Sequence, residues 1–183
     1  MVYKMGFRHI LEKLHLLKPI DYNSLEILRS RGVKIGENVD ILNSQIDGCH
    51  GFLISIGNNV TITGATLLAH DASTKKFLGY SKIGRIDIGN DVFIGKGAII
   101  LPNTRIGNRV VVGAGCVVAR DIPDNSVVIG NPCKILCSFD EYIEKNKKLL
   151  DTNPVYQTIF TEKTEEDKKR MWNELDGKIG FDV

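Results

Sequence analysis

The sequence predicts an all-β fold, a parallel β-helix of six-residue repeats that spans residues 35–137. A segment of the form Ile-Gly-x-x-Val occurs four times, beginning at Ile35, Ile56, Ile88 and Ile106. Between the last two copies an aliphatic residue recurs every six positions, and a small or β-branched residue follows four positions after each. A helix would place apolar residues three and four apart, and a half-buried strand would alternate them. A period of six with β-branched residues therefore predicts very short strands separated by turns.

The length of the repeat also predicts how the coils stack. Three repeats make a coil of 18 residues, the spacing between Ile88 and Ile106. Ile88 should therefore lie on Ile106, and Ile94 on Val112, in continuous aliphatic ladders with strands about 4.8 Å apart. Gly and Asn follow the aliphatic residue of each segment, and we expect both to supply the positive φ that such turns require.

Two irregular spacings predict insertions into the coils. The first two copies are 21 residues apart, 3 more than one coil, and the next two are 32 apart, a surplus of 14. The larger surplus cannot remain inside the coil, so we expect it to be extruded as a loop over residues 71–84. A loop of this length in an otherwise tight solenoid is usually functional.

The C-terminal segment, residues 138–183, is predicted to be helical. Ser138 can cap a helix that runs to about Leu150, with Glu141 completing a capping box. Thr164 can cap a second helix, which has acidic residues first and basic residues later. We expect these helices to seal the open end of the β-helix, which would otherwise expose unpaired strand edges.

The N-terminal segment, residues 1–34, mixes basic residues with leucines. The charges interrupt the apolar stretch and no small-residue cleavage site follows, so it does not read as a signal peptide. Two interpretations remain open. The segment is either a basic amphipathic helix in weak contact with a membrane surface or a helix packed on the end of the domain.

Composition excludes several classes of protein. Charged residues make up 25% and apolar residues 43% of the 183 residues, so the chain is neither disordered nor membrane-spanning. A net charge of +2 does not favour a nucleic-acid partner. The four cysteines include no CxxC pair, which argues against a disulfide framework or a zinc site and favours a reducing, cytoplasmic location.

Two stretches carry a resemblance to a known family. Residues 112–123, followed by 129–135, are similar to the signature of the galactoside and maltose O-acetyltransferases, and residues 69–73 resemble the O-acetyltransferases of capsule, exopolysaccharide and lipopolysaccharide synthesis. These are hexapeptide-repeat acyltransferases. The resemblance implies a left-handed coil, a homotrimer, acetyl-CoA as co-substrate, and active sites in grooves between subunits.

His70 is the residue that we expect to act as the general base. It ends its coil just before the predicted loop, where the family carries its catalytic histidine. A neutral imidazole suits the removal of a hydroxyl proton during attack on a thioester, by direct transfer in a ternary complex. Asp71 would then orient the imidazole, which requires a turn because adjacent strand residues point to opposite faces. Alternatively, Asp71 is a solvated turn residue.

The resemblance also implies the residues that bind the coenzyme. The backbone near Lys96, Ala114 and Ala119 should contact the pantetheine arm, as a strand edge would. Arg120 and Lys134 match basic positions near the phosphates of the coenzyme. The alternative for both side chains is a solvated corner residue.

Three residues are candidates for binding the acceptor. Asn43 approximately matches a family asparagine that contacts the sugar, although a turn residue is an equal alternative. Lys75 and Tyr80 lie in the predicted loop and supply a cation and an aromatic face. The acceptor is therefore expected to be a hydroxyl of a sugar or polysaccharide precursor. The alternative is an amino sugar or a serine-type acceptor on the same fold.

A metal-dependent β-helix enzyme resembling the gamma carbonic anhydrases is the main rival. Such an enzyme needs three histidines that converge on zinc across a subunit interface. Only His50 and His70 lie within the repeats, so we expect no metal cofactor.

Overall fold

The computed structural model describes residues 24–183, so the basic stretch near the N-terminus and its possible membrane contact lie outside the described residues. The first described element is α2 (Leu25–Ser30), whose Leu28 is buried in the core of the β-helix. Among the helices of residues 24–183, none is long and apolar enough to cross a bilayer.

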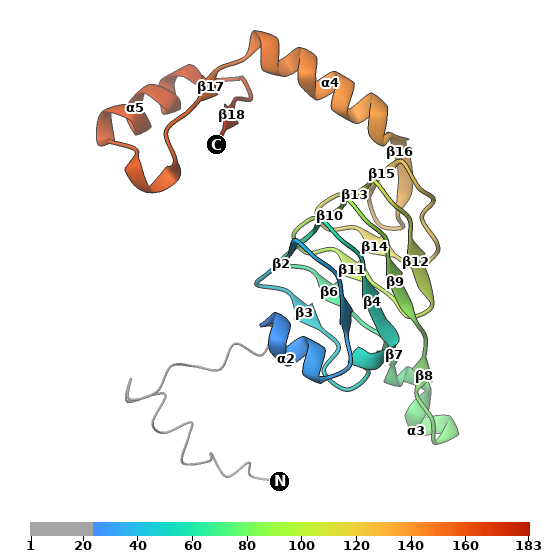
Figure 1. Ribbon diagram of the computed structural model, residues 1–183. Coiled ribbons are helices and arrows are strands. Elements are labelled where there is room, and N and C mark those ends of the chain that lie inside the picture. The colour runs from blue at the N-terminus through green and yellow to red at the C-terminus, as the bar shows by residue number, and fades with distance from the viewer. Residues whose placement is uncertain (1–23) are drawn as a thin grey trace, which may run out of the picture.

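The central body is a parallel β-helix, because the chain visits three parallel sheets in turn, one strand in each sheet per coil (Figure 1). Sheet A contains β1 (Lys34–Ile35), β4 (Ile54–Ile56), β9 (Ile86–Ile88) and β12 (Thr104–Ile106). Sheet B contains β2 (Val39–Leu42), β5 (Val60–Thr63), β10 (Val92–Ile94), β13 (Val110–Val112), β15 (Ser126–Ile129) and, antiparallel at its end, β16 (Lys134–Ser138). Sheet C contains β3 (Gln45–Ile46), β6 (Thr66–Leu67), β11 (Ile99–Ile100) and β14 (Val117–Val118).

The predicted aliphatic ladders are confirmed by the strand register. Ile88 pairs with Ile106 in sheet A, and Ile94 pairs with Val112 in sheet B. All four side chains are buried in the one core that runs through the coils. Burial of an aliphatic side chain of this size contributes about 1.5–3 kcal/mol relative to exposure, so the ladders are the main source of stability.

The turn from sheet A to sheet B, the A–B corner, repeats the same polar contact in every coil. Asn58, Asn90 and Asn108 each accept a hydrogen bond through Oδ1 from a backbone N–H of the preceding coil, at 2.8–2.9 Å. The positive φ lies at the residue after each of them, which is Asn59, Asp91 or Arg109, so asparagine supplies it in only one of these three coils. The expectation for glycine was wrong at this corner. Gly57 is required because a Cβ there would lie 2.5 Å from a backbone oxygen of the next coil.

The turn from sheet C to sheet A, the C–A corner, receives both insertions. The smaller one forms a short 3₁₀ helix, η1 (Gly51–Leu53), before β4. The larger one leaves the coil as an antiparallel pair, β7 (His70–Asp71) and β8 (Lys82–Ile83), which flanks η2 (Ala72–Thr74) and α3 (Lys75–Leu78). In Figure 1 this segment projects away from the coils. Two successive coils are therefore irregular at the same corner.

The predicted C-terminal helices are present, but they do not seal the β-helix. α4 (Phe139–Thr152) begins with the predicted capping box of Ser138 and Glu141, and Thr164 caps α5 (Glu165–Glu174). Neither helix has a buried residue, and α4 leads away from the coils (Figure 1). The strand edge of β15 is covered by β16 instead. The remaining elements are η3 (Phe160–Glu162) and the parallel pair β17 (Val155–Tyr156) and β18 (Phe181–Asp182).

Candidate active site

A buried carboxylate lies at the centre of the C–A corner. Asp47 follows β3 directly, and its side chain is fully buried. It accepts backbone hydrogen bonds from Cys49 N at 3.0 Å and His50 N at 2.9 Å within its own coil. It also accepts one from Ala69 N, in the next coil, at 3.0 Å. These three bonds fix the orientation of the carboxylate and tie the two irregular coils together.

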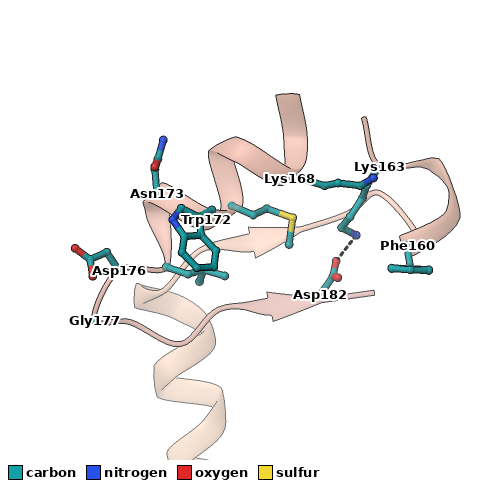
Figure 2. Close-up of a pocket in the computed structure, with 10 residues that line it drawn as sticks. Phe160, Lys163, Lys168, Trp172, Asn173, Asp176, Gly177 and Asp182 are labelled. Atoms are coloured by element: carbon teal, nitrogen blue, oxygen red, sulfur yellow. Dashed lines mark hydrogen bonds and ion pairs between the residues drawn. The ribbon is translucent and has the colours of Figure 1, made fainter. Parts of the chain in front are cut away.

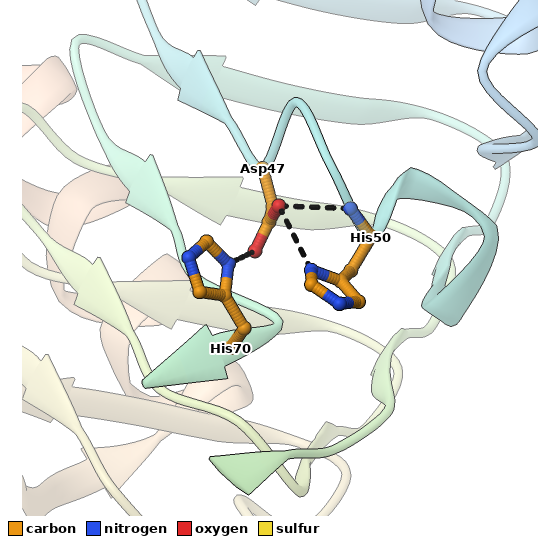
Figure 3. A group of neighbouring side chains, drawn as sticks. All are labelled: Asp47, His50 and His70. Carbon is orange, nitrogen blue, oxygen red and sulfur yellow. Dashed lines mark hydrogen bonds and ion pairs between the residues drawn. The ribbon is translucent and has the colours of Figure 1, made fainter. Parts of the chain in front are cut away.

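His70 meets this carboxylate. Its Nδ1 lies within hydrogen-bond distance of Asp47 Oδ2, as Figure 3 shows. Because an ionised carboxylate can only accept, Nδ1 carries the proton, and the neutral ring then has its lone pair on Nε2. The His70 side chain is 34% exposed. The arrangement therefore provides an oriented imidazole with an unprotonated Nε2 for a substrate proton.

The charge on Asp47 is maintained in spite of its burial. Burial is the largest influence on this carboxyl and acts to raise its pKa. The hydrogen bonds from His70 and from the backbones of His50 and Cys49 act in the opposite direction, and they hold the pKa below the ordinary value of 3.8. The carboxyl is therefore ionised at neutral pH and would stabilise the positive charge that forms when the His70 ring takes up a proton.

A second histidine lies beside this pair. The ring centroid of His50 is 4.9 Å from that of His70, with the planes inclined by 39°. Its Nδ1 lies 3.7 Å from Asp47 Oδ1. That nitrogen is buried, and none of the described residues forms a hydrogen bond with it. The smaller insertion thus brings a buried imidazole nitrogen to the same carboxylate.

Asp71 has other partners. Its carboxylate accepts a hydrogen bond from Ser73 N at 2.8 Å and pairs with Lys82 Nζ at 2.6 Å. The hydrogen bond from Lys82, reinforced by that from Ser73, lowers the pKa of Asp71 to about 2. The structure favours the turn alternative for Asp71, since the carboxylate that orients His70 is Asp47. Sequence analysis missed Asp47, although its position just before the smaller insertion, at the corner that His70 also occupies, was a usable signal.

The predicted acceptor residues are spread over two places. Asn43 is exposed at the turn from sheet B to sheet C, the B–C corner, with a φ of 49°. Lys75 and Tyr80 belong to the extruded segment beyond His70, where the Tyr80 side chain is 79% exposed. Within one chain, the loop residues follow the C–A corner directly, whereas Asn43 lies at a different corner.

The predicted coenzyme residues are exposed and also divided between corners. Lys96 and Ala114 stack on each other at the B–C corner, where Gly115 N donates to Lys96 O at 2.9 Å. Ala119 and Arg120 follow β14 at the C–A corner, and Lys134 begins β16. A single chain does not gather these five residues into one pocket.

Another hollow of the described residues lies outside the β-helix. It has a volume of about 790 Å³ and is located in the C-terminal region around α5. Phe160 and Trp172 are prominent in its lining, and Lys163 Nζ pairs with Asp182 at 2.8 Å across it (Figure 2). None of the ten residues that line it is a histidine or a cysteine. The two histidines of residues 24–183, His50 and His70, are instead at the C–A corner.

Comparison with known proteins shows similarity to hexapeptide-repeat proteins. The family model for the bacterial transferase hexapeptide (six repeats) matches residues 85–120. Protein CapG of Staphylococcus aureus is 38% identical over 79% of this chain and 84% of its own length. A galactoside O-acetyltransferase of Lactococcus lactis is 42% identical, but the match covers 45% of this chain and 39% of that protein.

Solved structures show the same architecture. A maltose O-acetyltransferase from Clostridium difficile 630 is 28% identical, with a TM-score of 0.51 over 72% of this chain and 85% of that one. A hexapeptide-repeat acetyltransferase from Vibrio cholerae has a TM-score of 0.53 at 22% identity, over 69% and 86% of the two chains, and it supports the fold alone.

Proposed function

Because this chain belongs to the bacterial hexapeptide-repeat acetyltransferases, we propose that it transfers an acetyl group from acetyl-CoA to a hydroxyl of a sugar or polysaccharide precursor. The observation that carries the proposal is the contact between His70 and the buried Asp47, which leaves Nε2 of an oriented imidazole free. The names of the galactoside and maltose O-acetyltransferases support a sugar hydroxyl as the acceptor.

In the proposed reaction, His70 Nε2 removes the proton of the acceptor hydroxyl while the oxygen attacks the thioester carbonyl. Asp47 is a positioning residue that holds Nδ1–H and stabilises the imidazolium that forms. A backbone N–H near Lys96 would stabilise the oxyanion of the tetrahedral intermediate. When the intermediate collapses, the C–S bond breaks and the imidazolium returns its proton to the departing CoA thiolate. The acetyl group passes directly to the acceptor, so no acyl-enzyme forms.

The division of the coenzyme residues between two corners supports a shared binding groove. A coenzyme that contacts the backbone near Lys96 and Ala114 at one corner, and Arg120 at another, needs corners from two adjacent chains. We therefore propose a homotrimer of left-handed coils with three interfacial active sites. Asn43 shares the B–C corner with Lys96 and would approach His70 from the neighbouring chain.

The extruded segment is proposed to hold the acceptor. It continues directly from His70, and its exposed Tyr80 and Lys75 offer an aromatic face and a cation. An aromatic ring packs against the apolar face of a sugar, and a lysine would suit an acidic or phosphate-bearing acceptor.

The test is an acceptor screen with the purified full chain and acetyl-labelled CoA, against nucleotide sugars, oligosaccharides, amino sugars and serine. We expect labelled product on a sugar hydroxyl, which mild alkali or hydroxylamine releases because it is an ester. Label that resists alkali on an amino sugar would show an amide and favour N-acetyl transfer. Label that stays covalently on the chain after denaturation would contradict direct transfer.

A further inference from the structure

The C–A corner also holds a set of ligand atoms that the transfer reaction does not fully use. One atom each of Asp47, His50 and His70 lies within 4.8 Å of the other two. The proposed reaction employs only Asp47 and His70. His50 contributes a buried Nδ1 that no described residue satisfies with a hydrogen bond. A buried polar atom without a partner in a native site calls for an explanation such as an ion.

We propose that Asp47, His50 and His70 bind a divalent transition-metal ion such as Zn²⁺, and that the bound ion blocks acetyl transfer. Two imidazoles and one carboxylate are a ligand set that zinc adopts, with a fourth position open to water. Imidazole nitrogen favours such ions over Mg²⁺ and Ca²⁺, which prefer oxygen ligands only. The site thus differs from the three-histidine zinc site considered above, because a carboxylate takes the place of the third histidine.

The geometry is close to what the ion needs. Ligand atoms bound about 2.0–2.1 Å from a tetrahedral zinc lie roughly 3.4 Å from one another. His50 Nδ1 is already 3.7 Å from Asp47 Oδ1 (Figure 3). His70 Nδ1 is closer to the carboxylate, in hydrogen-bond contact, and its ring would swing outward to admit the ion. The His70 side chain is 34% exposed, while backbone hydrogen bonds hold Asp47 in place.

Metal binding and base catalysis require opposite tautomers of His70. In the catalytic arrangement the proton sits on Nδ1, facing Asp47, and Nε2 has the lone pair. An ion bound at Nδ1 uses the lone pair there, so the neutral ring carries its proton on Nε2. The histidine then cannot accept a proton from the acceptor hydroxyl. This inhibition rests on the proposed role of His70, whereas the metal site itself does not.

Cobalt(II) is the probe, because its visible absorption reports the ligands directly and needs no catalytic activity. The full chain, freed of metals with a chelator, is titrated with CoCl₂ and then with ZnSO₄ as a competitor. We expect one Co²⁺ per chain with no thiolate charge-transfer band, and displacement by Zn²⁺. His50→Gln should weaken Co²⁺ binding by at least about 10–100-fold, the loss that even outer partners of a metal site cause. Asp71→Asn, which changes a carboxylate that is bonded to Lys82 and Ser73 instead, should leave the titration unchanged.

Activity measurements then test the inhibitory role. Zn²⁺ should inhibit the wild-type chain, whereas His50→Gln should retain its turnover in chelator and resist Zn²⁺. Equal Co²⁺ affinity of wild type and His50→Gln would overturn the site. Binding of Co²⁺ or Zn²⁺ that leaves wild-type turnover unchanged would overturn the inhibitory role. If His70→Ala kept full turnover, the proposed function would fail. The Co²⁺ titration would still decide whether the metal site exists, because it does not depend on turnover.

Discussion

At the A–B corner the same polar group returns in successive coils, whereas the C–A corner carries different residues in each coil. Asn58, Asn90 and Asn108 occupy equivalent positions, and each satisfies a backbone N–H of the coil before it. At the C–A corner, Asp47 and His70 come from adjacent coils, both interrupted by insertions. Both corners join strands of the same stacked coils. The sequence repeat explains the A–B corner, but it does not explain the C–A corner.

The difference shows how a repetitive fold separates stability from chemistry. An amide that recurs in successive coils contributes to their stacking, and its loss should lower the free energy of unfolding. A carboxylate that is buried once, and kept ionised by its partners, does not serve the repeat. Substitutions at the A–B corner should therefore lower stability and leave turnover unchanged, whereas substitutions of His70 or Asp47 should lower turnover.

The largest effect is expected at His70. Replacing it by Ala removes the proposed base, so kcat should fall by about 10²–10⁴-fold while acetyl-CoA binding stays near normal. Steady-state kinetics and a direct coenzyme-binding measurement check the two parts. A His70→Ala chain that keeps most of its turnover would remove the C–A corner from the chemistry.

Asp47→Asn should have the next largest effect. The amide keeps the shape of the side chain but cannot stabilise the imidazolium, so kcat should fall by about 10–100-fold, as when a partner that orients a histidine is lost. The KM for acetyl-CoA is the internal control and should change little.

The same variant has a defined dependence on pH. Folding lowers the pKa of Asp47 below its ordinary value of 3.8. The ionised carboxylate therefore stabilises the fold at pH values above 3.8, and this contribution is lost as the pH falls through the folded-state pKa. The stability difference between wild type and Asp47→Asn should therefore be constant near neutrality and shrink in acid. Urea denaturation at several pH values measures it, and a difference that grows in acid would contradict the assignment.

Asn90→Ala, at the A–B corner, should lower stability and leave turnover unchanged. The change leaves the backbone N–H of Asn58 without its partner, so the free energy of unfolding should fall by about 0.5–1.5 kcal/mol. Turnover should be unchanged, because the A–B corner does not contact the proposed base. Denaturation at matched protein concentration, paired with a kcat measurement, tests both statements. A loss of turnover without a loss of stability would end the distinction between the corners.

The regular part of the molecule could be predicted because it repeats. The stacking of Ile88 on Ile106 follows from an 18-residue period, and the capping box of Ser138 and Glu141 is a local signal. The sealing role of the C-terminal helices could not be predicted, because nothing local to α4 determines where the helix points.

The site could be predicted only in part. His70 is marked by the loop that follows it, but Asp47 is 23 residues earlier and becomes its neighbour only through stacking of two interrupted coils. The insertion of 3 residues hides that proximity in the sequence. Adjacency favoured Asp71 instead, although neighbouring residues of an extended strand point to opposite faces.

The smallest effect on catalysis is expected for Asp71→Asn, which compares the two carboxylates directly. Asp71 is bonded to Lys82 and Ser73 in the extruded segment, so its loss should leave kcat near the wild-type value, whereas Asp47→Asn lowers it. The pKa of Asp71 is lowered from its ordinary value of 3.8 to about 2. Its ion pair with Lys82 therefore orders the segment fully at pH values above 3.8, and this contribution is lost as the pH falls toward 2. Hydrogen exchange of residues 71–84 should therefore be faster in Asp71→Asn than in wild type near neutrality, and the two should converge in strong acid. If Asp71→Asn instead lost turnover as severely as Asp47→Asn, the adjacent aspartate would be the group that orients His70, and the buried one would serve only to join the coils.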